Sequence, residues 1–267
     1  MFDVQLAYDR RGTGPPLVLL HGAGHRRQAW LPVIERLAPH REVITVDLPG
    51  FGESPPLPDH LAYELDTAVI VMKEFFADLE LNRPHVAGNS MGGLISLALA
   101  QHGMVSSATA LSPAGLWTPL GRRISLAMIR QVHRTARWLP PRLAKRLSQS
   151  ATGRMLMCGL LFGRPDLLEP EVLLADMQAM ISSAGFSPTL AAGDRIVFAS
   201  RVHDVPVTIA WGSRDRLFRR PRADSIVRLI PNARLLRLPG CGHVPMNDNP
   251  ELVAHVLLTG SEERSTG

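Results

Sequence analysis

The sequence predicts an α/β fold in which a parallel sheet is interrupted by a helical insertion. Short apolar runs alternate with helical patterns over the first two-fifths of the chain. This rhythm stops near Leu116 and returns after about His203. Strands separated by helices favour parallel pairing with right-handed crossovers. At 267 residues, of which 45% are hydrophobic, the chain is long enough for one large domain or for one domain with an insertion.

Six apolar runs predict the strands of this sheet, and helical patterns lie between them. The strand candidates are residues 17–20, 42–46, 84–88, 108–111, 205–211 and 233–238. The helical patterns lie at about 29–38, 63–80, 91–102, 221–229 and 250–258. We therefore assign residues 1–115 and 205–267 to a mostly parallel, twisted sheet with helices on both faces.

The segment 116–204 reads mostly as helices and is assigned to the insertion. Its expected breaks are Pro140-Pro141, Gly153, Gly163, Pro165, Pro170 and residues 185–188. Between Gly121 and Arg164 it carries ten Lys or Arg residues and no Asp or Glu, in a chain with a formal charge of +5. We interpret this stretch as a solvated helical face. An anionic substrate or contact with an acidic membrane surface is the less favoured alternative. Nucleic acid is disfavoured further, because no nucleic-acid motif is present.

The remaining composition favours a reduced cytoplasmic protein. The N-terminus has no basic region followed by an apolar core, so no secretory signal is expected. No unbroken apolar stretch reaches the roughly 18 residues of a membrane-spanning helix. Cys158 and Cys241 lie far apart and form no metal-type cluster, although a lone disulfide between them stays open. We expect no metal and no organic cofactor, and the sequence gives no indication of the oligomeric state.

The strongest local motif is Gly-Asn-Ser-Met-Gly at residues 88–92, which matches G-x-S-x-G. A tight turn from strand to helix projects the serine clear of the backbone, and small residues two positions away let the strand and helix approach closely. The turn also aims the helix N-terminus at the reacting centre, where it favours developing negative charge. Ser90 is therefore the candidate nucleophile, and an ordinary strand–turn–helix connection is the alternative.

The sequence His-Gly-Ala-Gly at 21–24 directly follows the first strand candidate. The loop at this place supplies one backbone N–H of an oxyanion hole, and the residue after the nucleophile supplies the other. We assign these donors to Ala23 and Met91, with Gly24 as an alternative donor. His21 is interpreted as a residue that braces the loop rather than as a catalytic base.

Two further loops carry the candidate acid and base. Asp215 lies just past the end of a strand candidate, where a carboxylate can hold a histidine in the required tautomer; a simple turn aspartate is the alternative. His243 lies in a glycine-flanked loop before the last helix, and imidazole suits general acid–base work at neutral pH. Cys241 is interpreted as a structural residue rather than a nucleophile, because it does not lie in a nucleophile-elbow motif. The order Ser90, Asp215, His243, each at a strand end, is more specific than any one motif.

With these motifs, the chain resembles the α/β-hydrolase superfamily, in its serine-nucleophile branch with a helical cap. The resemblance covers about residues 3–115 and 205–260 and includes D-x-P-G-x-G-x-S at 47–54, a mainly structural loop in which Asp47 is not catalytic. It implies the α/β-hydrolase fold with 116–204 as the cap, and the catalytic triad Ser90, Asp215 and His243. A serine at position 90 disfavours the epoxide hydrolases and haloalkane dehalogenases, which use an aspartate.

The resemblance implies a serine hydrolase (carboxylesterase-like) that cleaves a small-molecule ester or related acyl bond. The elbow Gly-Asn-Ser-Met-Gly-Gly is also similar to that of meta-cleavage-product hydrolases, which break carbon–carbon bonds in dienoates. This chain lacks the proline of their H-G-x-G-P-G loop and has Val244 where an aromatic residue often follows their histidine. Carbon–carbon bond hydrolysis is therefore the second hypothesis. A ligand receptor that keeps the triad and signals through cap movement is the third.

Overall fold

A seven-stranded sheet forms the centre of the protein in the computed structural model, which describes residues 4–199 and 201–262. The strand order is β1-β3-β2-β4-β5-β6-β7; β1 is antiparallel to β3, and the other neighbouring pairs are parallel. The strands are β1 (Tyr8–Arg11), β2 (Pro16–Leu20), β3 (Glu42–Val46), β4 (His85–Asn89), β5 (Ser107–Leu111), β6 (Val207–Gly212) and β7 (Arg234–Leu238). The predicted α/β-hydrolase fold is confirmed.

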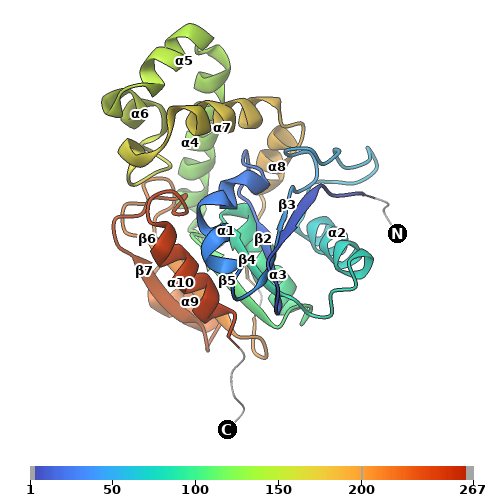
Figure 1. The fold of residues 1–267 in the computed structure, drawn as a ribbon. Helices are drawn as coiled ribbons and strands as arrows, with labels where there is room; N and C mark the ends of the chain where they lie inside the picture. Colours follow the sequence, from blue (N-terminus) through green and yellow to red (C-terminus); the bar gives the residue numbers. More distant parts are fainter. Residues whose placement is uncertain (1–3, 200, 263–267) are drawn as a thin grey trace.

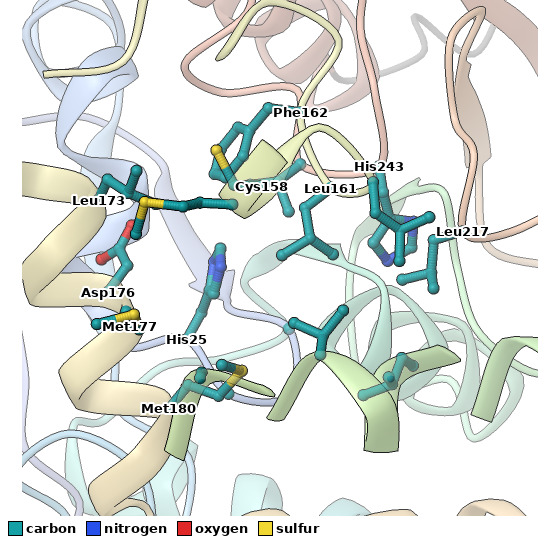
Figure 2. A pocket seen from close by; sticks show the side chains of 18 of the residues that line it. His25, Cys158, Leu161, Phe162, Leu173, Asp176, Met177, Met180, Leu217 and His243 are labelled. Atoms are coloured by element: carbon teal, nitrogen blue, oxygen red, sulfur yellow. The ribbon is translucent and has the colours of Figure 1, made fainter. Parts of the chain in front are cut away.

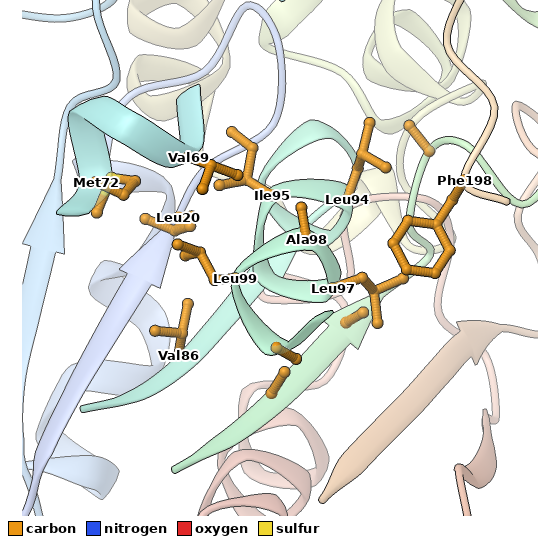
Figure 3. Close-up of a cluster of buried hydrophobic side chains, with 14 of the residues drawn as sticks. Leu20, Val69, Met72, Val86, Leu94, Ile95, Leu97, Ala98, Leu99 and Phe198 are labelled. Carbon is orange, nitrogen blue, oxygen red and sulfur yellow. The ribbon is translucent and has the colours of Figure 1, made fainter. Parts of the chain in front are cut away.

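Helices cover both faces of the sheet because the inner strands are apolar on both sides (Figure 1). In β2, Val18 and Leu20 pack into one buried cluster, whereas Leu17 and Leu19 pack into the other. Helices α2 (Leu65–Asp78), α3 (Met91–Gln101) and α9 (Ala223–Leu229) contribute to the first cluster, part of which Figure 3 shows. The second cluster is covered by α1 (Leu31–Leu37), which follows a short 3-10 helix η1 (Arg27–Trp30), and by α10 (Pro250–Gly260).

The chain between β5 and β6 is helical and lies over one end of the sheet (Figure 1). It contains α4 (Pro119–Trp138), α5 (Pro141–Ser148), α6 (Ala151–Cys158), η2 (Pro165–Leu167), α7 (Pro170–Ser182) and α8 (Phe186–Gly193). A proline in the first turn begins four of these elements, where its missing N–H costs no hydrogen bond. We call this segment the insertion.

Several boundaries differ from the sequence prediction. Strand β1 was not predicted, because its four residues are polar and exposed and show no apolar alternation. The prediction that Gly153 breaks the helical pattern of the insertion was wrong. This glycine lies in the first turn of α6, where its N–H donates to the Ser150 side chain (3.0 Å), and its missing side chain lets α6 pack against the Leu147 carbonyl. None of the helices in the described ranges combines the length and apolar character that a membrane crossing requires.

Candidate active site

Ser90 occupies a strained turn between β4 and α3. Its φ of 56° lies in the left-handed region, which residues other than glycine rarely adopt. The strand and helix meet without side chains at Gly88 and Gly92: a Cβ at Gly88 would overlap the Gly92 carbonyl group, and one at Gly92 would overlap the Leu20 carbonyl oxygen. The Ser90 N–H donates to the Leu111 carbonyl (2.9 Å), which fixes the turn on the neighbouring strand β5. The side chain thus stands at the N-terminus of α3.

The loop after β2 runs beside Ser90. A Cβ on Gly22 would lie 3.2 Å from the Ser90 Cβ, so a larger residue there would crowd the serine. Ala23 follows Gly22 and lines the same cavity as Ser90. Met91 is the first residue of α3, and the first N–H groups of an α-helix have no partner within the helix. The backbone of Ala23 and of Met91 therefore flanks the serine.

His21 braces this loop from within the protein. Its ring is fully buried; Nδ1–H donates to the Gly22 carbonyl (2.8 Å), and Nε2 accepts from the Leu48 N–H (2.9 Å). Both contacts together require the neutral ring. Burial accordingly lowers the pKa of His21 to about 4, against smaller raising effects of the Gly22 carbonyl and Asp47. Because its two nitrogens are occupied, His21 is not available as a general base.

His243 and Asp215 form a buried pair that links the loops after β7 and β6. His243 Nδ1 lies 3.0 Å from Asp215 Oδ2, and the side chains are 3% and 1% exposed. The other carboxylate oxygen accepts from the backbone N–H groups of Leu217 (2.9 Å) and Phe218 (2.8 Å). Burial raises the pKa of Asp215, but His243 and the Phe218 N–H outweigh it, so the pKa is below its usual value. An ionised Asp215 therefore accepts a hydrogen bond from Nδ1–H of His243, which leaves the Nε2 lone pair available.

The backbone of the His243 loop is held by groups that the sequence analysis did not single out. The Leu161 carbonyl, from the insertion, accepts from the N–H groups of His243 (2.7 Å) and Val244 (3.0 Å). The Asn89 amide donates to the His243 carbonyl (2.8 Å) and so connects this loop to the elbow. The Asp248 carboxylate accepts from the N–H groups of Gly163, Arg164 and Gly242 at 2.7–2.8 Å. The insertion therefore helps to position the histidine.

Ser90 and His243 line one cavity of about 430 Å³ between the sheet edge and the insertion. The loops after β2, β4, β6 and β7 form its floor, which places it at the carboxyl ends of the parallel strands. The insertion supplies mostly apolar side chains, among them Leu161, Phe162, Leu173, Met177 and Met180 (Figure 2). The three residues predicted to form the triad thus converge on this place, although Asp215 reaches it only behind His243.

The sequence matches a known protein family over most of its length. The model of the family described as "Alpha/beta hydrolase family" matches residues 17–256. The chain belongs to this family. It is 29% identical to the dihydrolipoyllysine-residue acetyltransferase component of the acetoin cleaving system of Pseudomonas putida, over 92% of this chain and 63% of that protein. The chain therefore spans less than two thirds of that relative.

Other similar proteins include esterases. The chain is 27% identical to the pimeloyl-[acyl-carrier protein] methyl ester esterase of Vibrio vulnificus, over 96% of this chain and 98% of that protein. Among solved structures, a thermophilic esterase from Thermogutta terrifontis has a TM-score of 0.74 at 22% identity, over 96% of this chain and 92% of that one. At 22% identity, the likeness to the Thermogutta terrifontis esterase shows the fold alone.

Other polar residues singled out in the sequence of this α/β hydrolase have structural roles. The Asp47 carboxylate accepts from the backbone N–H groups of Arg27 (2.6 Å) and Glu53 (2.9 Å) and pairs with the Arg27 guanidinium, away from the cavity. Cys158 and Cys241 are both free and buried, and burial raises the pKa of each thiol to about 12. Within the described residues, no group of three or more His, Cys, Asp or Glu side chains could hold a metal ion.

Proposed function

We propose that this α/β hydrolase cleaves carboxylic esters, or related acyl bonds, through an acyl-enzyme on Ser90. One observation carries the proposal: a serine in a strained elbow shares a cavity with an imidazole whose Nδ1 is held by a buried carboxylate. Three distant parts of the chain supply these groups, and each lies at the end of a different parallel strand. An esterase from Vibrio vulnificus that aligns over nearly the whole chain gives further support.

In the proposed first step, Ser90 Oγ attacks the acyl carbon while His243 Nε2 takes its proton. The Nδ1–H bond to Asp215 keeps the lone pair on Nε2 and stabilises the imidazolium that forms. The backbone N–H groups of Ala23 and Met91 bind the oxygen that becomes negatively charged. His243 then protonates the leaving alcohol, and a water molecule repeats the sequence on the acyl-enzyme to release the acid.

The cavity favours an apolar acyl group. Leu, Met and Phe side chains dominate the part formed by the insertion, and burying methylene groups there is favourable by about 0.8 kcal/mol each. Carbon–carbon cleavage of an anionic dienoate is less well supported. Of the described residues that line the cavity, none is Arg or Lys, whereas Asp176 is one of them. A bound carboxylate would therefore meet an acidic side chain, with no Lys or Arg among the described lining residues to pair with it.

Replacing the nucleophile tests the proposal. Ser90→Ala should lower kcat/KM for p-nitrophenyl butyrate by about 10³-fold or more, because the attacking oxygen is removed. The melting temperature should change little, since the Ser90 side chain makes no structural hydrogen bond with the described residues. Ser96→Ala is the matched control, because that serine is buried in α3 and donates to the Gly92 carbonyl (2.8 Å) outside the cavity.

Near-normal ester hydrolysis by Ser90→Ala would refute the assignment. A dienoate assayed beside the ester distinguishes ester hydrolysis from carbon–carbon bond hydrolysis. The second hypothesis predicts turnover of the dienoate instead of the ester. Slow turnover of both substrates by the wild-type protein, with a large ligand-induced change in protease sensitivity, is the result expected of a receptor.

A further inference from the structure

Besides Ser90 and His243, further polar side chains line the cavity. Those of Asn89, Gln131 and Thr135 make hydrogen bonds within the chain, whereas those of His25 and Asp176 make none with the described residues. His25 follows the Ala23 loop and is 9% exposed, whereas Asp176 lies on α7 of the insertion. Figure 2 shows them on the same side of the cavity, with Leu161 between His25 and His243 in this view. The core thus contributes His25, and the insertion contributes Asp176, to a cavity that apolar side chains such as Leu173 and Met180 also line.

Neither group has a hydrogen-bond partner among the residues that the structure describes. His25 Nδ1 is completely buried and unpartnered, and the Asp176 carboxylate accepts no hydrogen bond from the described part of the chain. Buried polar groups in folded proteins are nearly always hydrogen-bonded, so exceptions in a cavity call for a bound partner. In ligand sites, a few polar groups among apolar ones fix the orientation of the ligand.

The protonation states of His25 and Asp176 limit which ligand groups the two side chains can bind. Burial lowers the pKa of His25, against the raising effect of Asp176, so the ring is neutral at pH 7. Burial also raises the pKa of Asp176, against the attraction of His25 and Arg26. The region therefore offers an imidazole N–H as donor and a carboxyl group as acceptor.

We propose that His25 and Asp176 form a subsite that binds a hydroxyl group of the ester substrate, at a distance from the scissile bond. A hydroxyl can accept from the imidazole N–H and donate to the carboxylate at the same time. An alkyl group would leave both residues unpartnered, and a carboxylate would be repelled by Asp176. This inference rests on the proposed ester hydrolysis and adds a substrate class to it: esters with a second, free hydroxyl.

The hydroxyl could belong to the acyl chain or to the alcohol part of the ester, and two pairs of substrates distinguish these sources. The first pair is p-nitrophenyl 6-hydroxyhexanoate and p-nitrophenyl hexanoate. The second pair is glycerol monohexanoate and propyl hexanoate. In one of the pairs, the wild-type protein should show a kcat/KM at least about tenfold higher for the hydroxylated ester, because a site built to bind a hydroxyl discriminates strongly against its absence.

Variants of the two residues test the assignment to this pair. His25→Phe and Asp176→Leu should each bring the ratio of kcat/KM within the responsive substrate pair close to one, while hydrolysis of the plain ester is retained. The change should appear mainly in KM, because the hydroxyl is bound equally in the ground and transition states. Met177→Leu is the control on the same helix, lines the same cavity, and should leave the ratio unchanged.

Equal kcat/KM values within both substrate pairs for the wild-type protein would overturn the subsite, and this result does not depend on whether the variants fold. A preference that survives both His25→Phe and Asp176→Leu would also overturn it. Normal Ser90-dependent turnover of plain esters without any hydroxyl preference removes the subsite and leaves the proposed function standing. Absence of turnover in all four substrates would contradict the proposed function as well.

Discussion

The sheet edge and the insertion meet at the cavity, but they are built by different means. At the sheet edge, backbone groups and missing side chains fix the geometry: Gly88 and Gly92 let β4 and α3 touch, and buried hydrogen bonds hold His21 and Asp215. The insertion contributes apolar side chains to the cavity, and its α4–α6 stretch carries cations without acids. We infer that the sheet edge determines the reaction and that the insertion determines which substrates enter.

The two regions are not independent, because the insertion also holds the loop of His243, the proposed base. The Leu161 carbonyl binds two N–H groups of that loop, and Asp248 connects it to Gly163 and Arg164. A substitution in the insertion can therefore reach the chemistry through these contacts, or through the hydrogen bonds of Ser125 and Gly159 with the Asp215 loop. Substitutions elsewhere in it should change selectivity alone.

Apart from replacement of Ser90 itself, the largest effect is expected at the sheet edge, from Asp215→Asn. An amide nitrogen facing His243 Nδ1 favours the tautomer with the proton on Nε2, which cannot take the proton of Ser90. We expect kcat to fall by about 10⁴-fold with little change in the melting temperature. Asp224→Asn, on the exposed side of α9, is the control and should keep full activity. A loss below tenfold for Asp215→Asn would mean that this carboxylate does not orient the base.

Next in size is a loss of stability from Gly92→Ala. The new Cβ would overlap the Leu20 carbonyl oxygen and crowd that of His21, so β2 and α3 would have to separate. Such overpacking costs about 1–3 kcal/mol of unfolding free energy, and we expect the upper part of this range because backbone atoms cannot rotate away. Gly121→Ala in α4 of the insertion, where the Cβ meets only the Thr118 hydroxyl at 3.1 Å, should change stability by less than about 1 kcal/mol. Equal unfolding free energies in chemical denaturation would contradict this contrast.

The buried His21 should make the sheet edge sensitive to acid. The pKa of His21 is about 4 in the folded protein and about 6.5 in the unfolded chain. Below pH 6.5 the unfolded chain therefore binds a proton that the folded protein does not bind. This contribution to stability is complete above pH 6.5 and is lost as the pH falls toward 4. Between pH 7 and 4.5, His21→Gln should lose about 2 kcal/mol less unfolding free energy than the wild-type protein. Parallel pH profiles of the two proteins would show that His21 is not the group responsible.

The smallest effect is expected in the insertion, from Met177→Trp. A larger side chain in the apolar part of the cavity should lower kcat/KM for p-nitrophenyl octanoate by about tenfold and that for the acetate by less than threefold. Val172→Trp, on an exposed position of the same helix, should leave both values unchanged. An equal loss with both esters would indicate that the insertion acts on the chemistry rather than on chain-length selection.

The same contrast explains what could be predicted from the sequence. The elbow, the His21 loop and the Asp215 and His243 loops are short motifs whose glycines and strand ends are visible in the residues themselves. Strand β1 was missed because polar residues 8–11 pair only at an exposed edge. His25, Asp176 and Asp248 gave no signal, because their roles depend on a helix and a loop that come together only in the folded chain.

Chemical labelling of the folded wild-type protein tests the central claim most directly. A fluorophosphonate should form one adduct per chain, and peptide mass spectrometry should place it on Ser90, because this serine stands in the strained elbow and shares the cavity with His243, which Asp215 holds. The adduct should disappear in Ser90→Ala and form far more slowly in Asp215→Asn. An adduct on another residue, or a folded wild-type protein that stays unlabelled, would contradict the account.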